Sequence, residues 1–599
     1  MNAHPSRRPW LTAAIAAPLT LVGALVLASC STGDTADTGA TLGTGSEASV
    51  ELATVEAVDP GATAAEVMAD NEAAPGGDGD DTWSVADETA ITLSGSSATS
   101  DSDAVSVDDG TVTITAAGTY RLSGDLDGQV VVNVPGDGLV RLVLDGVDIA
   151  SDSSAAIAIT AAEEVQVVLA DGSSNTLADT AAYADGADVN AALFSATDLV
   201  IAAESAGTGE LVVHGNGNDG IASKDGLRIT GGTITVDAVD DGIRGKDEVQ
   251  IDGGTITVTA GGDGLKADDE EDADRGYLAI AGGDVTVTAG GDGLDAATDV
   301  VVWGGTLDVT SGGGHEASVA EDASAKGLKG RVYVVIDGGS VTVDAAEDAI
   351  HTDNTAHLAD GTVEVAAGDD GVHADVALTV SGGTVDVTAS YEGLEGSAIT
   401  IAGGTTRVAA SDDGVNVSAG DVASTADALT LTVTGGTLEV DADGDGLDAN
   451  GSISMSGGTV TVQGPTNDGN AALDYDGTFD ITGGTLIAVG ASGMAMAPGA
   501  DASQASVLVT LDRTVAAGTT LQVTASDGTV VGTVTAAKQA GSVAFSSPGL
   551  VNGETYTVTA EGAAVGSAVA GEQVSMGMPG GGRPGGGGGP GGGQPPTRP

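Results

Sequence analysis

A six-residue phrase in which apolar and polar side chains alternate recurs along the middle of the chain. It opens with Gly-Gly or Asp-Gly, as in GGTITV, and ends in Val; copies begin at positions 231, 253, 282, 304, 338, 360, 382, 403, 435 and 457. Most successive copies are separated by nearly the same short step, as between 231 and 253, whereas longer steps, as between 304 and 338, contain insertions. A fixed period of this length indicates stacked repeats.

Alternation with a period of two is typical of strands with one buried face. Stacking the repeats in register aligns two apolar columns: Ile234, Ile256, Val285, Leu307, Val341, Val363, Val385, Leu438 and Val460; and Val236, Val258, Val287, Val309, Val343, Val365, Val387, Val408, Val440 and Val462. The sequence therefore predicts an all-β solenoid, a parallel β-helix of about 22 residues per coil, with an aliphatic interior. Its glycine pairs supply the positive-φ turns, and function is expected on the outer faces and turns.

The phrase and its neighbouring strands suggest five segments. The β-helix is expected over 89–500, a small all-β module or cap over 501–570, and a disordered Gly/Pro-rich tail over 571–599. Residues 30–88 are rich in small and acidic residues without periodicity, which predicts a flexible acidic tether.

Residues 1–29 have the features of an export signal. Arg7 and Arg8 precede an apolar run that ends at Leu27-Ala28-Ser29-Cys30, and Cys30 is the chain's one cysteine. This order resembles a bacterial lipobox and predicts that Cys30 is lipidated, so that the protein is exported and lipid-anchored on the extracellular face of the cell membrane. An uncleaved membrane helix is the alternative. The run from Ser6 to Leu11 also resembles a twin-arginine export motif.

The chain is strongly acidic, with 88 Asp and Glu against 18 Lys and Arg and a formal charge of −70. Nucleic-acid binding is not expected, because phosphate contacts need Lys and Arg. Peripheral binding to anionic lipid is disfavoured for the same reason, so membrane contact is expected through the lipid anchor alone. We expect a monomer.

A second phrase, in which an acid usually precedes Gly, repeats in phase with the first. The recurring acids are Asp219, Asp241, Asp263, Asp292, Asp348, Asp370, Glu392, Asp413, Asp445 and Asp468. Stacking places them a strand spacing of about 4.8 Å apart, where two bare carboxylates repel by roughly 3–4 kcal/mol at an effective dielectric near 20. Oxygen ligands that span one Ca²⁺ lie at a similar separation. The candidate calcium ligands are Asp240, Asp241, Asp263, Asp348, Asp369, Asp370, Asp412 and Asp413.

Plain turn chemistry is the alternative explanation of these acids, because Asp-Gly favours turns without metal. Zinc and iron centres are disfavoured by a chain with six His and one lipidated Cys. His351 and His373 occupy the same position of successive repeats and are expected to stack as exposed turn residues rather than ligands.

Basic residues are rare, so their positions are informative. Arg244 and Lys266 occupy equivalent positions of successive repeats, as do Lys224 and Lys246, while Lys326, Lys329 and Arg331 occupy a repeat whose acid is missing at Ala325. They could neutralise neighbouring carboxylates or bind a carboxylated sugar; proton abstraction, as in a polysaccharide lyase, is a third possibility. The candidate carbohydrate-binding residues are Arg244, Lys246, Lys266 and Lys329.

The ordered set of motifs resembles a known family. SKDGL (223–227), DDGIRGKD (240–247), GGDGLKAD (261–268), AKGLKG (325–330), EDAIH (347–351), DDGVHAD (369–375) and SYEGLEG (390–396) carry the resemblance. They resemble the bacterial carbohydrate-binding-domain lipoprotein family, whose fold is a right-handed parallel β-helix similar to that of pectate lyases. The resemblance implies calcium in the acidic turns and binding of polysaccharide, with acidic, pectin-like chains favoured. Gly262, Gly291 and Gly444 replace a second acid and make calcium doubtful in those repeats.

We therefore expect a non-catalytic, calcium-stabilised surface lipoprotein that binds polysaccharide. A polysaccharide lyase acting on uronate polymers is the enzymatic alternative, and a structural spacer or adhesin is the second.

Overall fold

The computed structural model describes residues 58–76, 83–184, 186–320, 323–419 and 429–572. Within these ranges the regular structure is strand, apart from one α-helix and one short 3-10 helix, which confirms the prediction of an all-β chain. Neither of the helices that these ranges contain could cross a membrane. The predicted signal segment and Cys30 lie outside the described residues, so the lipid anchor stays a prediction.

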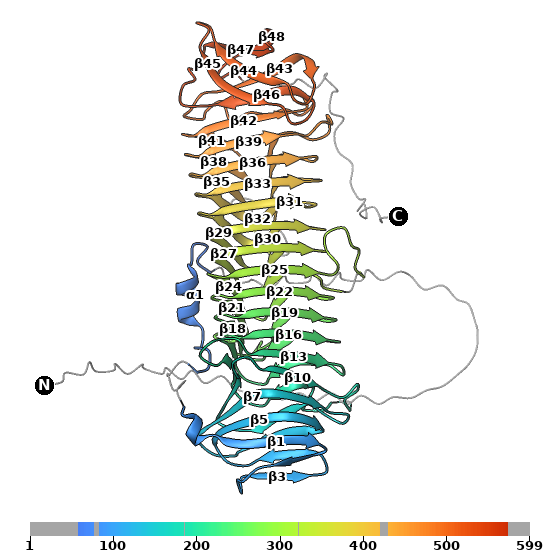
Figure 1. The fold of residues 1–599 in the computed structure, drawn as a ribbon. Coiled ribbons are helices and arrows are strands. Elements are labelled where there is room, and N and C mark those ends of the chain that lie inside the picture. The colour runs from blue at the N-terminus through green and yellow to red at the C-terminus, as the bar shows by residue number, and fades with distance from the viewer. Residues whose placement is uncertain (1–57, 77–82, 185, 321–322, 420–428, 573–599) are drawn as a thin grey trace, which may run out of the picture. The chain divides into compact units, whose positions relative to one another are not determined.

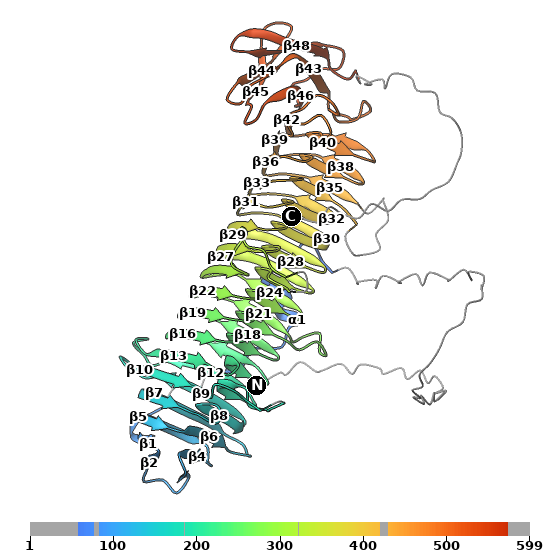
Figure 2. The same cartoon turned by 90° about the vertical axis from the view of Figure 1, so that its right-hand side faces the viewer.

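Three ladders of parallel strands run through the repeats, and each repeat contributes to all three (Figures 1 and 2). The first ladder carries the alternating phrase and contains β10 (Ser174–Ala178), β13 (Glu210–Gly215), β16 (Thr233–Ala238), β19 (Thr255–Ala260), β22 (Asp284–Ala289), β25 (Thr306–Ser311), β27 (Tyr333–Ala345), β29 (Thr355–Ala367), β31 (Thr384–Ala389), β33 (Thr405–Ala410), β36 (Thr437–Ala442), β39 (Thr459–Gln463) and β42 (Thr485–Gly490).

The second ladder follows the acidic turns. It contains β8 (Ile157–Ala161), β11 (Ala191–Ser195), β14 (Asp219–Ser223), β17 (Ile243–Gly245), β20 (Leu265–Ala267), β23 (Leu294–Ala296), β26 (Leu328–Gly330), β28 (Ile350–Thr352), β30 (Val372–Val380), β32 (Leu394–Ile401), β34 (Val415–Val417), β37 (Leu447–Ala449) and β40 (Leu473–Tyr475).

The third ladder completes each repeat, and β27, β29, β30 and β32 are long enough to take part in two ladders. Its other strands are β9 (Glu164–Leu169), β12 (Leu199–Ala203), β15 (Leu227–Ile229), β18 (Glu248–Ile251), β21 (Tyr277–Ile280), β24 (Asp299–Val302), β35 (Thr430–Val433), β38 (Ser452–Met455) and β41 (Phe479–Ile481). Before the regular repeats, β1 (Thr89–Gly95), β5 (Gly118–Asp127) and β7 (Leu139–Ala150) pair in parallel, as do β4 (Thr111–Ile114) and β6 (Gln129–Asn133).

The two apolar columns lie in register in the first ladder, as predicted. Ile234 pairs with Ile256 and Val236 with Val258, and the same correspondence continues from repeat to repeat. The side chains of both columns are almost fully buried, so the repeats share one continuous core. The second glycine of the phrase has a positive φ, 101° at Gly232 and 104° at Gly254, which explains the recurrent Gly-Gly.

The last repeat is continued by antiparallel strands. β42 pairs with β46 (Ala540–Ser546), which in turn pairs with β43 (Ser506–Val515). β44 (Thr520–Ala525), β45 (Val530–Thr535), β47 (Thr555–Ala560) and β48 (Ala563–Val569) form a separate four-stranded sheet. These strands have their own apolar cluster around Phe545 and occupy the edge that the final repeat would otherwise expose.

Part of the predicted tether is ordered against the repeats. Residues 58–76 contain α1 (Ala64–Asp70), which lies beside β24 and β27 (Figure 1) and packs Ala64 and Val67 against Val301 and Val335. The prediction of a flexible segment thus differs from the structure here, because Thr63 and Glu66 form a capping box that starts a short amphipathic helix.

Trp83, also assigned to the tether, packs against Val143 and Val168 of β7 and β9. The guanidinium of Arg141 lies 4.5 Å from the centre of its ring, and its indole N–H donates to Glu88 Oε1 at 2.8 Å. Trp303 packs in the apolar cluster under α1. Both indoles therefore serve packing.

Replacing Thr63 by Ala is expected to loosen α1 without affecting the repeats. The change removes the capping hydrogen bond from the Glu66 N–H and should cost about 1 kcal/mol, so amides of residues 64–70 should exchange with solvent roughly fivefold faster. Glu66→Gln is the matched control, because Gln still completes a capping box. Hydrogen exchange read by mass spectrometry tests this, and equal rates in Thr63→Ala and the native chain would refute the role of the cap.

Candidate cation-binding site

The recurring acids form a continuous file, which we call the acid file. Its positions are Asp219, Asp241, Asp263, Asp292, Lys326, Asp348, Asp370, Glu392, Asp413, Asp445 and Ala471. The main-chain carbonyl of a file residue accepts a hydrogen bond from the residue that directly follows the previous member of the file. For example, the Gly242 N–H, after Asp241, donates to the Asp263 carbonyl, and the Gly264 N–H, after Asp263, donates to the Asp292 carbonyl. The acidic positions are thus stacked by main-chain hydrogen bonds, one repeat apart.

Two members of this file correct the sequence prediction. The residue that replaces the acid is Lys326, not Ala325: its N–H donates to Asp292 Oδ1 at 2.7 Å, and its carbonyl accepts from Gly293. The last position is Ala471, because it accepts from Gly446, whereas Asp468 lies outside the file and accepts from the Gly493 N–H. Insertions precede both positions, and counting from the turn phrase alone cannot resolve the register after an insertion.

One carboxylate oxygen of most file residues is bound to the main chain. Asp241 Oδ1 accepts the Asp263 N–H at 3.0 Å, and Asp263 Oδ1 accepts the Asp292 N–H at 2.8 Å. The same bond joins Asp348 to the Asp370 N–H at 3.1 Å and Asp413 to the Asp445 N–H at 2.6 Å. The second oxygen is therefore left to meet a neighbouring side chain.

That neighbour comes from a second column, three residues further along the chain, which we call the companion column. Its members pair in register along the second ladder: Arg244, Lys266, Asp295, Lys329, His351, His373, Glu395, Asn416, Asp448 and Asp474. The column changes from mostly basic to acidic along the chain.

Basic residues neutralise the first half of the acid file. Arg244 lies 2.7 Å from Asp219 Oδ2, and Lys329 lies 2.9 Å from Asp292 Oδ2 and 3.0 Å from Asp295 Oδ1. Lys266 pairs with Asp263, and this carboxylate helps to raise the pKa of Lys266 against the opposing effect of burial. Three of the four predicted sugar-binding residues are therefore paired with carboxylates of the acid file or the companion column.

The fourth, Lys246, lies apart from these columns. Its ammonium pairs with Asp269 and lies 3.8 Å from Asp247, and its side chain is 42% exposed. The structure therefore does not gather the four predicted residues into one patch.

Histidines occupy the middle of the companion column, and they are only partly exposed rather than solvent-facing as predicted. His351 Nδ1 lies 2.8 Å from Asp348 Oδ2, and His373 Nδ1 lies 2.8 Å from Glu395 Oε2 and 3.1 Å from Asp370 Oδ2. Burial opposes the charged imidazole of His373, but its carboxylate partners raise the pKa to about 12. The surroundings of this ring favour a positive charge.

The last part of the file has acids in both columns. One carboxylate oxygen from each of Asp413, Asp445 and Asp448 lies within 4.8 Å of the others. Burial and the charges of nearby carboxylates raise the pKa of Asp413 to about 7 and of Asp448 to about 6. Among the described residues, no Lys, Arg or His forms an ion pair with these three acids or with Asp412.

Asn416 supplies a further oxygen near this group. It stands in the companion column between Glu395 and Asp448, and its Nδ2 donates to Glu392 Oε2 at 2.6 Å. Its Oδ1 is buried and has no hydrogen-bond partner among the described residues. Carboxylate and amide oxygens are the ligands that Ca²⁺ prefers, so the donor chemistry of this region fits that ion.

The structure therefore divides the predicted calcium ligands. Asp412 and Asp413 lie where no side-chain cation is described, whereas Asp241, Asp263, Asp348 and Asp370 each have a Lys or His partner. Asp240 and Asp369 are exposed, and Asp240 accepts a hydrogen bond from Asn218. The prediction did not single out Asp448, although its place three residues after Asp445 could have identified it.

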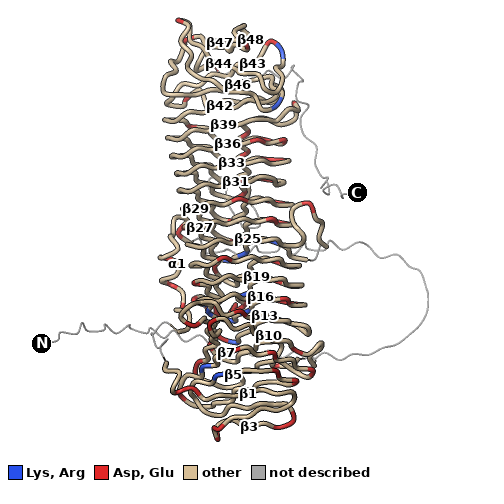
Figure 3. Tube along the Cα trace, viewed as in Figure 1, with Lys and Arg blue, Asp and Glu red and all other residues tan. Residues whose placement is uncertain are grey.

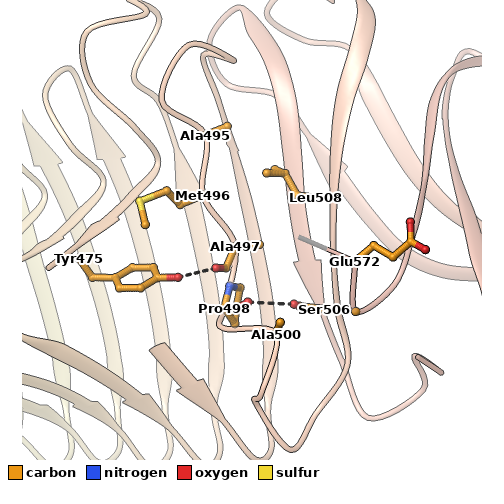
Figure 4. Close-up of a pocket in the computed structure, with 10 residues that line it drawn as sticks. Tyr475, Ala495, Met496, Ala497, Pro498, Ala500, Ser506, Leu508 and Glu572 are labelled. Carbon is orange, nitrogen blue, oxygen red and sulfur yellow. Dashed lines mark hydrogen bonds between the residues drawn. The ribbon is translucent and has the colours of Figure 1, made fainter. Parts of the chain in front are cut away.

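Figure 3 shows how sparse Lys and Arg are among the acids of the stacked repeats. Lys266, Lys329 and Arg331 line one open hollow of about 440 Å³, together with Glu270, Asp295 and Asp353. A smaller pocket of about 150 Å³ lies between Tyr475 and the strands that follow the last repeat (Figure 4). Its Tyr475 hydroxyl donates to the Ala497 carbonyl at 2.8 Å.

The chain is similar to known proteins. A family model described as carbohydrate-binding domain-containing protein matches residues 108–371 and 371–570. A curated relative of the same description, from Acetivibrio thermocellus, is 43% identical over 141 residues, which are 23% of this chain and 48% of the relative. The chain thus spans about half the length of that relative. A solved structure, a polysaccharide lyase-like protein from C. thermocellum in a gadolinium derivative, shares 32% identity over 46% of this chain and 98% of its own, with a TM-score of 0.35.

Without metal, the stability of the protein is expected to fall as the pH rises from about 4 to 7. Asp413 and Asp448 have raised pKa values, so the folded protein retains protons that the unfolded chain has already released, and folding becomes less favourable as those protons are lost. Melting temperatures in chelator at pH 5 and 7.5 measure the fall. Asp413→Asn should reduce it, whereas Asp480→Asn, at an exposed position, should not. An equal fall in all three proteins would contradict the assignment.

Lys266→Met is expected to make a neutralised repeat depend on an added cation. The change leaves the carboxylates of Asp241, Asp263 and Asp295 without their shared ammonium, so the melting temperature in chelator should drop by several degrees. Added Ca²⁺ should then restore more stability to this variant than to the native protein. Lys224→Met removes an exposed ammonium with no described ion pair and is the control. Equal effects of Ca²⁺ in both variants would contradict the idea that Lys266 occupies a cation position.

Proposed function

Since the chain belongs to the carbohydrate-binding domain-containing protein family, we propose that it is a surface lipoprotein that binds acidic, pectin-like polysaccharide without cleaving it. In this proposal the three ladders form a right-handed parallel β-helix, stabilised by Ca²⁺ in its acidic turns. Export and lipid attachment at Cys30 belong to the same proposal and rest on the sequence from Met1 to Cys30.

The observation that carries the calcium proposal is the Asp413–Asp445–Asp448 group. Each acidic repeat before it has a Lys, Arg or His partner within the file or companion column, or an Asn donor at Glu392, but this group has no described cation. Clustered, partly buried carboxylates cannot all stay ionised cheaply, so either protons or a metal ion must compensate them. Asp413, Asp445 and Asp448, with Asp412 and the Asn416 amide oxygen nearby, would hold Ca²⁺ and link two consecutive repeats.

Bound calcium would also explain how an acidic glycan approaches a protein of charge −70. The basic residues predicted for this purpose are occupied by the chain's own carboxylates, which favours a metal-mediated contact. Tyr391 lies in the neighbouring turn, is 45% exposed, and forms a side-chain hydrogen bond with Asp412 that helps to raise the pKa of the phenol to about 12. Its ring offers a stacking surface for a sugar beside the metal group.

The interactions of Arg244 support a role without catalysis. Its guanidinium pairs with Asp219 and with Asp268 at 3.3 Å, and although burial opposes the charge, these carboxylates raise its pKa above the ordinary value. A proton-abstracting base needs the opposite shift. Arg244 is therefore better suited to neutralise the acid file than to act as the base of a lyase.

The glycan proposal is tested by affinity electrophoresis of the full chain in gels with polygalacturonate or a neutral glucan. We expect retardation by polygalacturonate with Ca²⁺, and its loss in chelator. Asp413→Asn should weaken retention at least tenfold, and Tyr391→Ala about three- to tenfold, because each removes part of the contact. Arg331→Ala, in the hollow with Lys266 and Lys329, is the control and should bind like the native protein.

Several outcomes would overturn this proposal. Retention that persists in chelator, or that is lost in Arg331→Ala alone, would place the glycan away from the calcium group. No retention on any glycan would favour a spacer or adhesin. Ultraviolet absorbance from unsaturated uronate, when the protein is incubated with pectate and calcium, would identify a lyase.

A further inference from the structure

A cluster of a different chemical kind lies in the middle of the acid file. His351 and His373 pair across β28 and β30, and their rings stack with centroids 5.0 Å apart and an interplanar angle of 20°. Of the histidines in the described residues, only these two stand in the companion column. Imidazole nitrogen is therefore available at two successive levels of the companion column, beside a file of mostly oxygen ligands.

His373 faces two carboxylates through the same nitrogen. Its Nδ1 lies 2.8 Å from Glu395 Oε2 and 3.1 Å from Asp370 Oδ2, and one ligand atom of each of the three residues lies within 4.8 Å of the others. The side chains of His373, Glu395 and Asp370 are 17%, 15% and 9% exposed. Three ligand atoms of two chemical types thus converge at a largely buried point.

The other ring nitrogen of His373 is also held in place. Nε2 lies 3.1 Å from Asp375 Oδ1, in the same β30 strand. If a metal ion replaced the hydrogen on Nδ1, the Nε2–H would still donate to Asp375, and the Nδ1 lone pair would point toward the ion between Asp370 and Glu395. A carboxylate that orients a histidine through its second nitrogen is a common feature of metal centres, where it fixes the tautomer and strengthens the ligand.

The adjacent histidine has a similar arrangement, but a cation of the chain already occupies it. Lys326 Nζ lies 3.1 Å from Asp348 Oδ2, the oxygen that also faces His351, and 3.7 Å from Glu347 Oε2. In contrast, among the residues the structure describes, Asp370, Asp375 and Glu395 have ion pairs with His373 alone. The two repeats therefore differ in the one feature that decides whether a metal ion is accommodated.

The donor set also distinguishes this cluster from the Asp413–Asp445–Asp448 group. Ca²⁺ takes oxygen ligands and gains little from imidazole. A site of one imidazole and two carboxylates suits Zn²⁺ and its first-row neighbours, which bind His nitrogen and carboxylate oxygen at about 2.0–2.2 Å. A small number of histidines disfavours zinc in the sequence, but that number does not reveal that one histidine meets two acids through the same nitrogen.

We propose that His373, Asp370 and Glu395 form a binding site for a divalent transition-metal ion of the Zn²⁺ class, with Asp375 as the residue that orients the imidazole. Three protein ligands leave a coordination position for water or another ligand. Binding removes the hydrogen from Nδ1 if the ring is protonated, and that proton passes to solvent. The site is separate from the proposed calcium group and requires no glycan.

The test uses the full chain, freed of metals with chelator and returned to a buffer that contains Ca²⁺. Titration with Co²⁺ reports nitrogen and oxygen coordination through its visible spectrum, and Zn²⁺ is counted by elemental analysis after dialysis. We expect about one tightly held ion per chain, with Zn²⁺ displacing Co²⁺. His373→Gln and Glu395→Gln should each weaken binding more than tenfold, and Asp375→Asn about 10- to 100-fold.

His351→Gln is the matched control, because it removes the stacked neighbour but leaves the three ligands; it should keep the ion. Asp413→Asn should also keep Zn²⁺ while losing the Ca²⁺-dependent rise in melting temperature, so the two metal proposals fail independently. Circular dichroism of each variant establishes whether it is folded. If His373→Gln does not fold, Glu395→Gln provides the test of the site. Absence of stoichiometric Zn²⁺ or Co²⁺ in the native chain, or loss of the ion in His351→Gln but not in folded His373→Gln or Glu395→Gln, would overturn the assignment.

Discussion

The repeat-to-repeat hydrogen bond between the carboxylate of one file residue and the main chain of the next is the constraint on which the site depends. It holds Asp241, Asp263, Asp348 and Asp413 through one oxygen each and fixes where the other oxygen points. The stabilising contact therefore places like charges about 4.8 Å apart, and the structure must compensate a repulsion that its own architecture creates. The companion column lies where that compensation is needed.

Compensation along the file changes in kind. Arg244, Lys266 and Lys329 supply permanent charges, His351 and His373 supply groups that can carry a proton, and Asp448 and Asp474 add negative charge instead. In the proposed function, the part played by bound Ca²⁺ therefore increases along the chain. This order also explains why the basic residues that were predicted to bind an acidic glycan pair with carboxylates of the chain itself. The acid file lies much closer to these residues than any glycan would.

The sequence predicted the features that recur identically in every stacked repeat. The columns that contain Ile256 and Val258 follow from alternation and period, and the Gly254 turn follows from its positive φ. Features that depend on insertions or on side-chain direction were not predictable in this way. Lys326 and Ala471 occupy file positions because the insertions before them change the spacing between the turn phrase and the file. The side-chain rotamer of His373 determines which of its nitrogens faces Glu395, and the sequence does not specify that rotamer. The helix α1 was signalled only by Thr63 and Glu66, three residues apart, within a segment without periodicity.

The two proposed metal groups lie on one file, so their mutual influence needs consideration. Glu395 and Asp413 belong to neighbouring repeats, whereas the centres of the two groups lie about two repeat steps, or about 10 Å, apart. Two uncompensated divalent ions at that distance would repel appreciably. Asp370 and Glu395 would neutralise a divalent ion beside His373, however, and three Asp carboxylates would more than neutralise a Ca²⁺ ion. Each group then carries little net charge, so occupancy of one site should alter the other weakly. The file can thus hold ions of different chemistry at different levels, because each level compensates its own charge.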